Sequence, residues 1–235
     1  MNIPQARIIS QKIVEALIAE SSNRKFIFSY LKEKHQILIE EGQDWLAKIY
    51  LPWTVECSQD AEIAENPDTH FSLVLIRAGQ AVTGYFHQGQ LIDHKVFRAY
   101  MVRQKQGKSQ IKHLKTKGKS RAGSRIRLAE TERFFEEINE RLTSYSSLYP
   151  IDFWGISCAK TMWPFYFSSA IAPPFSPKAE NLIELSFHIS QASFEELKSA
   201  GELLQKYHLI LSEKGKAEFE EFETRIIPSA KSEDW

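Results

Sequence analysis

The residues most able to do chemistry in this sequence are cations gathered in one stretch, VRQKQGKSQIKHLKTKGKSRAGSRIR. This stretch, Val102 to Arg127, holds ten Lys or Arg residues and no acidic one, in a chain whose formal net charge is zero. Guanidinium and ammonium groups bind phosphates through charge-assisted hydrogen bonds and give a salt-dependent affinity for RNA or DNA. The stretch therefore predicts contact with a polyanion.

The charge asymmetry extends beyond this stretch. Starting the window at Lys95 gives twelve basic residues in thirty-three positions without an Asp or Glu, and the remaining chain carries eighteen basic residues against thirty acidic ones. The alternative interpretation is a solvated charged loop with no ligand, but the single sign of the charge and the position between two ordered elements favour binding. The candidate RNA-binding residues are Lys95, Arg98, Arg103, Lys105, Lys108, Lys112, Lys115, Lys117, Lys119, Arg121, Arg125 and Arg127.

Local patterns place the basic stretch between a strand and a long helix. Residues 71–79 form a nearly continuous apolar run of strand length, and a turn at 88–90 predicts a hairpin with the amphipathic run 91–103. After the stretch, Ser120 or Ser124 is the expected N-cap of a helix. Apolar residues then recur at helical spacing, at Leu128, Phe134, Phe135, Ile138 and Leu142.

The rest of the chain is predicted to form helices and strands. Residues 5–50 are expected to be helical, and Cys57 to His70 is expected to be a linker or long loop. Further strands are expected at 151–156 and 182–188, and further helices at 193–207 and 213–225. The predicted fold class is α/β (α+β), a mixed β-sheet flanked by helices and preceded by N-terminal helices.

Global composition narrows the class of protein. With 235 residues and 43% apolar content the chain can bury a sizeable core. It has no run of about eighteen apolar residues and no signal-type apolar block near its N-terminus, so we expect neither a membrane span nor a secretory peptide. Cys57 and Cys158 form neither a CxxC pair nor a disulfide framework. A reduced, cytoplasmic protein is expected.

Other kinds of site have less support in the sequence. The seven histidines show no HExxH motif or close ligand pair, so neither a metal nor a cofactor is expected. Asp93 and Asp152 lie near predicted strand ends, but two scattered carboxylates are a weak basis for a two-metal nuclease, and we interpret them as turn or cap residues. An aromatic cluster is suited either to stacking on bases or, the preferred interpretation, to packing. Its members are Trp154, Trp163, Phe165, Tyr166 and Phe167.

The run HKVFRAYMVRQKQGKSQ followed by RAGSRIRLAE resembles the release-factor-like domain of the ribosome quality control peptidyl-tRNA hydrolases, known in animals as the ankyrin-repeat and zinc-finger peptidyl-tRNA hydrolase. In that family an HK-led strand runs into a KQGGSQ-like loop, and a small-residue segment with arginines begins a helix. The resemblance covers Phe71 to Tyr207 and indicates a compact bacterial-type member. The matching residues are His94, Lys95, Phe97, Arg98, Tyr100, Val102, Arg103, Lys105, Gln106, Gly107, Ser109, Gln110, Arg121, Ala122, Gly123, Ser124 and Arg127.

This resemblance implies a fold similar to the ribonuclease H-like middle domain of eukaryotic peptide release factors, with a mobile loop that enters the peptidyl transferase centre. It implies catalytic positions at Gln110, Ser109 and Gly107. Because a Gln side chain has no useful pKa, Gln110 can only orient a water, a ribose hydroxyl or a developing oxyanion. The implied partners are the large ribosomal subunit and peptidyl-tRNA.

The implied activity is cleavage of peptidyl-tRNA on stalled large subunits, in ribosome rescue and quality control. Two bonds remain candidates for cleavage, the peptidyl ester and a phosphodiester at the acceptor CCA end. The arginine content favours cleavage of the phosphodiester, an endonuclease reaction. The expected division is an N-terminal helical segment at 1–60, a release-factor-like domain at 70–210 with a basic catalytic loop at 104–123, and a C-terminal helix and tail at 211–235.

The sequence departs from the family pattern in two places. Lys108 stands where the family has a second glycine, which removes a residue that adopts positive φ at little cost. After the small-residue segment the family continues with paired arginines, Tyr and Asn, whereas this chain has Arg125, Ile126, Arg127, Leu128 and Ala129. Lys108 favours an alternative function, a non-catalytic ribosome- or RNA-binding factor that uses the same basic loop only to dock.

Overall fold

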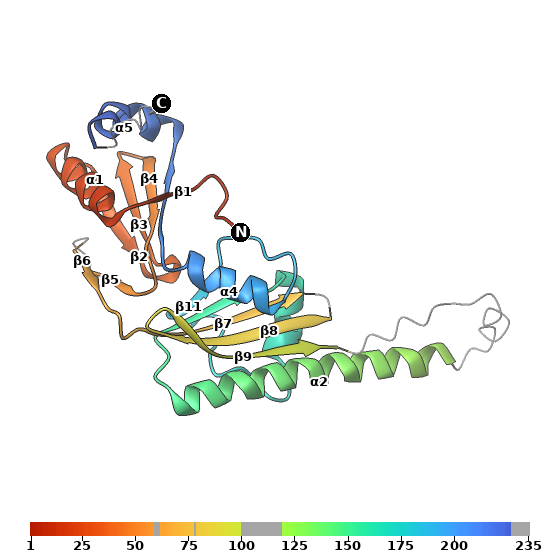
Figure 1. Cartoon of the computed structure of the whole chain (residues 1–235). Coiled ribbons are helices and arrows are strands. Elements are labelled where there is room, and N and C mark those ends of the chain that lie inside the picture. The colour runs from red at the N-terminus through yellow and green to blue at the C-terminus, as the bar shows by residue number, and fades with distance from the viewer. Residues whose placement is uncertain (59–61, 78, 100–118, 227–235) are drawn as a thin grey trace, which may run out of the picture.

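Among the residues that the structure describes, the strands form two five-stranded sheets and one two-stranded pair, with helices packed on the larger sheets (Figure 1). A computed structural model describes residues 1–58, 62–77, 79–99 and 119–226, with the backbone alone over 119–131 and 220–226. None of the helices described combines the length and the apolar character needed to span a bilayer.

The central sheet has the strand order β11-β10-β7-β8-β9. Strands β7, β8 and β9 form an antiparallel meander, whereas β10 is parallel to β7 and β11 is parallel to β10. The sequence-based expectation of a mixed sheet flanked by helices is confirmed, and so is the hairpin that turns near Gly89. The bounds are β7 (His70–Arg77), β8 (Gln80–His87), β9 (Gln90–Arg98), β10 (Phe153–Ser157) and β11 (Leu182–Glu184).

A helix covers each face of this sheet. Helix α2 (Lys119–Leu148) packs on the face of β7 that carries Val74 and Ile76, together with the short η3 (Lys160–Met162) and α3 (Trp163–Phe167). Helix α4 (Phe194–Leu203) packs on the opposite face, which carries Leu73 and Leu75. Because successive residues of a strand point to opposite faces, β7 is buried on both sides, and this explains its continuous apolar run.

The second sheet has the order β1-β12-β4-β3-β2, and all of its pairings are antiparallel. Helices α1 (Gln11–Asn23) and α5 (Glu213–Ile226) pack against it. The strand bounds are β1 (Arg7–Ile9), β2 (Ile27–Leu31), β3 (Gln36–Glu41), β4 (Asp44–Tyr50) and β12 (Tyr207–Leu211), with η1 (Lys32–Lys34) between β2 and β3. The core of this part includes Val14, Leu17, Ile37, Ile39, Ile49 and Phe219.

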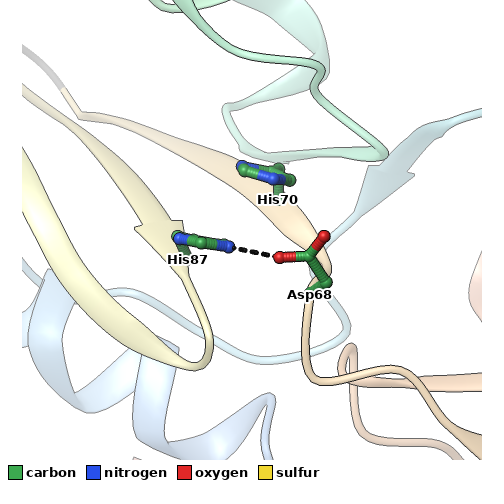
Figure 2. A group of neighbouring side chains, drawn as sticks. All are labelled: Asp68, His70 and His87. Atoms are coloured by element: carbon green, nitrogen blue, oxygen red, sulfur yellow. Dashed lines mark hydrogen bonds and ion pairs between the residues drawn. The ribbon is translucent and has the colours of Figure 1, made fainter.

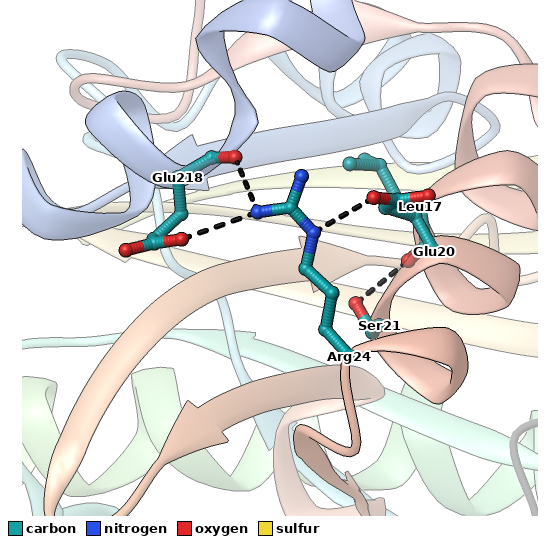
Figure 3. Close-up of polar contacts among 5 residues, drawn as sticks. All are labelled: Leu17, Glu20, Ser21, Arg24 and Glu218. Carbon is teal, nitrogen blue, oxygen red and sulfur yellow. Dashed lines mark hydrogen bonds and ion pairs between the residues drawn. The ribbon is translucent and has the colours of Figure 1, made fainter.

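Arg24, at the C-terminal end of α1, joins the two helices of this second part (Figure 3). Its Nε donates to Oε1 of Glu20 at 2.7 Å, and its Nη1 donates to the backbone oxygen of Glu218 at 3.0 Å and to Oε2 of Glu218 at 3.2 Å. One guanidinium therefore connects the N-terminal helix to α5, 194 positions later in the chain.

The prediction of helices over residues 5–50 is wrong outside α1, because strand β1 precedes this helix and three strands follow it. The helix ends at Asn23, and β2, β3 and β4 follow as antiparallel strands. Phe26, Phe28 and Tyr30 lie two residues apart, which is the strand period, and all three pack as partly buried residues against the core of the second sheet.

Three smaller expectations also need correction. The segment expected to be a linker, 57–70, contains β6 (Ile63–Glu65), which pairs antiparallel with β5 (Val55–Cys57) at the start of that segment. Helix α2 begins at Lys119, before Ser120 and Ser124, so neither serine precedes the helix as an N-cap would. Strand β11 ends at Glu184, short of the expected 182–188, while β10, α4 and α5 form close to the expected positions.

Candidate functional site

Strand β9 is the edge strand that leads toward the basic segment, residues 102–127. On β9, Phe97 is buried at 3% exposure, whereas Lys95 and Arg98 are exposed. The Lys95 ammonium lies 5.0 Å from the Phe97 ring centroid, a cation–π contact on the same face of the strand. Both candidate phosphate-binding residues that the structure describes in full are therefore open to solvent at the end of the sheet.

Backbone contacts hold β9 and the residue after it, Ala99, in place. The Ala99 backbone N–H donates to the carbonyl of Gly79 at 3.0 Å, and Arg98 pairs in register with Gln80 of β8. The expected catalytic residues Gly107, Ser109 and Gln110 lie outside the described residues. The basic candidates Arg103, Lys105, Lys108, Lys112, Lys115 and Lys117 also lie outside them.

The basic segment ends within the first turns of helix α2. Among the side chains of α2 that the structure describes, the buried apolar ones pack beneath the central sheet, namely Phe134, Phe135, Ile138, Leu142 and Tyr145. The guanidinium of Arg141 donates to Asp93 of β9 and lies 4.8 Å from the Tyr145 ring centroid. Apolar packing and this ion pair together fix the direction of α2 relative to β9.

The first part of α2 extends past the end of the sheet (Figure 1). Phe134 is the first buried residue among those whose side chains are described. At 1.5 Å per residue, about 22 Å of helix precede it. Lys119, Arg121, Arg125 and Arg127 fall within the first nine residues of α2, and only their backbone is described. A helix N-terminus carries partial positive charge, so the helix and its basic residues both favour an anion there.

The other candidates from the sequence have structural roles. The Oδ2 of Asp152 accepts a hydrogen bond from the His70 backbone N–H at 2.8 Å, which agrees with its interpretation as a capping residue. Asp93 instead pairs with Arg141. In the aromatic cluster Trp154 and Tyr166 are buried, and Trp163 and Phe167 pack against the same core, which agrees with the interpretation that the cluster serves packing. Phe165 is exposed.

A group of side chains at the opposite end of β7 and β8 was not predicted from the sequence. The histidines form no close ligand pair along the chain, but the fold places His70 directly across from His87, with Asp68 beside them (Figure 2). The signal was the hairpin register, since a turn near residue 79 pairs position 70 with position 87. This group is separate from the basic segment.

Fold and site together define a class of protein. A mixed sheet whose edge strand runs into a segment rich in basic and free of acidic residues, followed by a long helix packed under the same sheet, agrees with the release-factor-like resemblance. Residues 71–212 match the family described as the Bacteroidetes VLRF1 release factor, and this match spans more than half of the chain. The chain belongs to this family.

The chain also shows similarity to a solved structure. Among the solved structures, the chain described as "Vms1 mitochondrial localization core" is similar at 13% sequence identity and a TM-score of 0.45, over 90% of this chain and 93% of that chain. No curated protein matches the chain.

Proposed function

We propose that this protein is a ribosome-associated, release-factor-like enzyme that cleaves peptidyl-tRNA on stalled large ribosomal subunits. The observation that carries the proposal is the basic segment, which joins β9 to α2 inside the residues matched by the release factor family. We assign the activity to the release-factor-like unit at 70–210, with its catalytic loop at 104–123, and not to the flanking units at 1–60 and 211–235. The proposed location is the cytoplasm.

The proposed roles follow from side-chain chemistry. Gln110 orients a water or a ribose hydroxyl and donates to the developing oxyanion, since an amide neither gains nor loses a proton near neutral pH. Gly107 and Ser109 shape the backbone beside it. The exposed Lys95 and Arg98 at the end of β9 contact RNA phosphates, as do the basic residues at the start of α2.

Two bonds are compatible with this arrangement. Hydrolysis of the peptidyl ester requires little more than an oriented water, whereas an endonuclease cut at the CCA end makes use of guanidinium groups to stabilise a charged phosphoryl centre. Arg121, Arg125 and Arg127 lie within a short basic region at the start of α2. We therefore favour the phosphodiester cut, and the 3′ end of the released tRNA distinguishes the two reactions.

The test measures release of the labelled nascent chain from stalled large subunits that carry peptidyl-tRNA. Gln110→Ala is expected to leave ribosome binding unchanged and to slow release by about 100-fold or more, the scale for loss of one preorganised hydrogen-bond donor. Gln104→Ala is the matched control, a neighbouring glutamine to which the proposal assigns no role. Equal release by wild type and Gln110→Ala would exclude Gln110 from the reaction.

The second candidate function is a non-catalytic factor that docks on the ribosome through the same basic segment. Lys108 favours it, because the family has a glycine at this position and a lysine restricts the backbone. If wild type binds stalled subunits without releasing the chain and Lys108→Gly restores release, the docking function is correct. If wild type releases the chain, the enzymatic function is correct, and Lys108→Gly is expected to preserve or raise the rate of chain release.

A further inference from the structure

Three side chains able to ligate a metal ion meet at the end of β7 and β8, far from the basic segment (Figure 2). Asp68, His70 and His87 each offer a ligand atom, and these atoms all lie within 4.8 Å of one another. The two imidazole rings stack with centroids 4.1 Å apart and planes inclined by 8°. The His87 Nε2 and the Asp68 Oδ1 are 2.8 Å apart.

Backbone contacts hold this group in place. His70 and His87 are paired in register across the antiparallel β7-β8 ladder. Asp152 fixes the backbone of His70 from both sides, because its carboxylate accepts from the His70 N–H and its own N–H donates to the His70 carbonyl, each at 2.8 Å. Asp68 lies in a turn closed by the Thr69 N–H, which donates to the carbonyl of Asn66 at 3.3 Å. The strand ladder and the turn therefore bring the three side chains together.

A buried tyrosine orients one of the rings. The Tyr85 hydroxyl lies 2.7 Å from Nδ1 of His70, and Tyr85 is held by stacking on Tyr149, with ring centroids 4.0 Å apart. When Nδ1–H donates to this oxygen, Nε2 of His70 carries the free lone pair. Metal-binding histidines are commonly held in this way, with the second ring nitrogen bonded to an oxygen outside the ligand set.

We propose that Asp68, His70 and His87 bind one divalent transition-metal ion, with Zn²⁺ as the best match. Two imidazole nitrogens and one carboxylate oxygen are typical zinc ligands, while Mg²⁺ and Ca²⁺ prefer oxygen alone. Metal–ligand bonds of about 2.0–2.2 Å place neighbouring ligand atoms of a tetrahedral ion roughly 3.3 Å apart. Small side-chain rotations bring the observed separations to this value.

Binding replaces a proton that is now shared within the group. In the structure His87 Nε2–H donates to the carboxylate of Asp68. The ion occupies the place of that hydrogen, so His87 Nε2 and Asp68 Oδ1 become ligands and the proton of the neutral His87 ring moves to Nδ1. The Asp68 side chain is 79% exposed, so water has access to complete the fourth position.

The site does not belong to the proposed reaction centre. Strand β8 runs from Gln80, which pairs with Arg98 beside the basic segment, to His87 at the other end. Seven residue steps along an extended strand span about 23 Å. The ion therefore stabilises the fold by connecting the turn at Asp68 to the β7-β8 hairpin, and its existence is independent of the proposed function.

The experiment measures Zn²⁺ binding to the full-length chain by competition with a chromogenic chelator. We expect one equivalent to bind and the thermal midpoint to rise with Zn²⁺ concentration. Asp68→Asn and His87→Ala are each expected to weaken binding by at least about 10-fold and to reduce the thermal shift. The matched control is His188→Ala, at an exposed histidine outside the group, for which binding is expected to be unchanged.

Cobalt substitution separates this site from binding at the two thiols, Cys57 and Cys158. A Co²⁺ spectrum of nitrogen and oxygen coordination, lost in His87→Ala, supports the proposal, whereas a thiolate charge-transfer band places the ion elsewhere and overturns it. The proposal also fails if wild type binds no Zn²⁺, or if folded His87→Ala, checked by circular dichroism, binds it as tightly as wild type.

Discussion

Arg141 of α2 donates a hydrogen bond through Nη2 to Oδ2 of Asp93 on β9, and this pair joins the two elements that flank the basic segment. The Arg141 and Asp93 side chains are 29% and 41% exposed, so the pair is partly shielded from water. The Arg141 guanidinium also stacks near Tyr145. A charge-assisted contact of this kind is stronger than a fully exposed ion pair.

We expect a double-mutant cycle with Arg141→Met and Asp93→Asn to give a coupling free energy of about 1 kcal/mol in urea unfolding. The value stays modest because both partners retain some solvent access. The control is the exposed pair of Lys198 and Glu202, whose atoms are 4.0 Å apart and which is expected to give about 0.3 kcal/mol or less. Equal coupling in both cycles would show that Asp93 and Arg141 contribute no more than a surface pair.

Gly201 sets the distance between α4 and the central sheet. A Cβ at this position would lie 2.8 Å from Cζ of Phe86 and closer still to Cε1. Phe86 is buried and stacked on Phe71, with ring centroids 4.7 Å apart, so it has no room to rotate away. The helix itself must shift to accommodate a larger residue.

Gly201→Ala is therefore expected to lower the free energy of unfolding by about 1–3 kcal/mol, although alanine is the better helix former. Urea unfolding followed by circular dichroism measures the change. Ser199→Ala, on the exposed side of the same helix, is expected to stay within about 0.5 kcal/mol of wild type. A neutral or stabilising Gly201→Ala would mean that α4 packs less closely than the structure indicates.

His35 is a buried histidine that is neutral in the folded protein. Its Nε2–H donates to the carbonyl of Pro52 at 2.9 Å, and its Nδ1 accepts from the Tyr30 hydroxyl at 2.6 Å. Burial lowers the pKa of His35 to about 4 from its ordinary value of 6.5. As the pH falls, the unfolded chain therefore binds the proton first, and protonation favours unfolding.

The stability contributed by neutral His35 is complete above about pH 6.5 and declines as the pH falls toward 4, by roughly 3 kcal/mol in total. His208, whose pKa burial also lowers, acts in the same direction. Unfolding measured from pH 7 to pH 4 is expected to show a shallower loss for His35→Asn than for wild type; Asn tolerates the positive φ of 48° at this position. The exposed control His188→Ala should keep the wild-type slope, and an unchanged slope in His35→Asn would contradict the assignment.

Local signals allowed much of the central sheet to be predicted. Gln88 and Gly89 both adopt positive φ, at 50° and 70°, as a tight hairpin turn between β8 and β9 requires. The apolar spacing of α2 and the Ser193 cap of α4, which accepts from the Glu196 N–H, are equally local. These features depend on residues that are near one another in the sequence.

The second sheet could not be predicted in this way. Strand β12 pairs with β1 and β4, so its place depends on residues more than 150 positions away. The two candidate sites differ in the same respect. A one-signed run of charge is visible in the sequence, whereas the group of Asp68, His70 and His87 exists only because the β7-β8 register brings distant residues into contact.

The salt dependence of ribosome binding tests whether the basic segment forms the contact surface. Each phosphate contact contributes about 0.7–0.9 to the slope of log affinity against log salt. Changing Lys115, Lys117 and Lys119 together to Ala is expected to flatten the slope by about 2–3 and to weaken binding most at low salt. The measurement is binding of labelled large subunits, or of tRNA, over a series of salt concentrations.

The control for this experiment removes the same net charge elsewhere. Lys12, Lys178 and Lys206 are exposed residues outside the basic segment, so changing all three to Ala matches the long-range electrostatic effect without touching the proposed surface. Because only released counterions at direct phosphate contacts change the slope, this variant is expected to bind more weakly by a small factor with the wild-type slope. A slope that is the same in wild type and in the Lys115, Lys117 and Lys119 variant would remove these lysines from the surface that meets RNA. A flattened slope in both variants would assign the effect to net charge and not to the segment between β9 and α2.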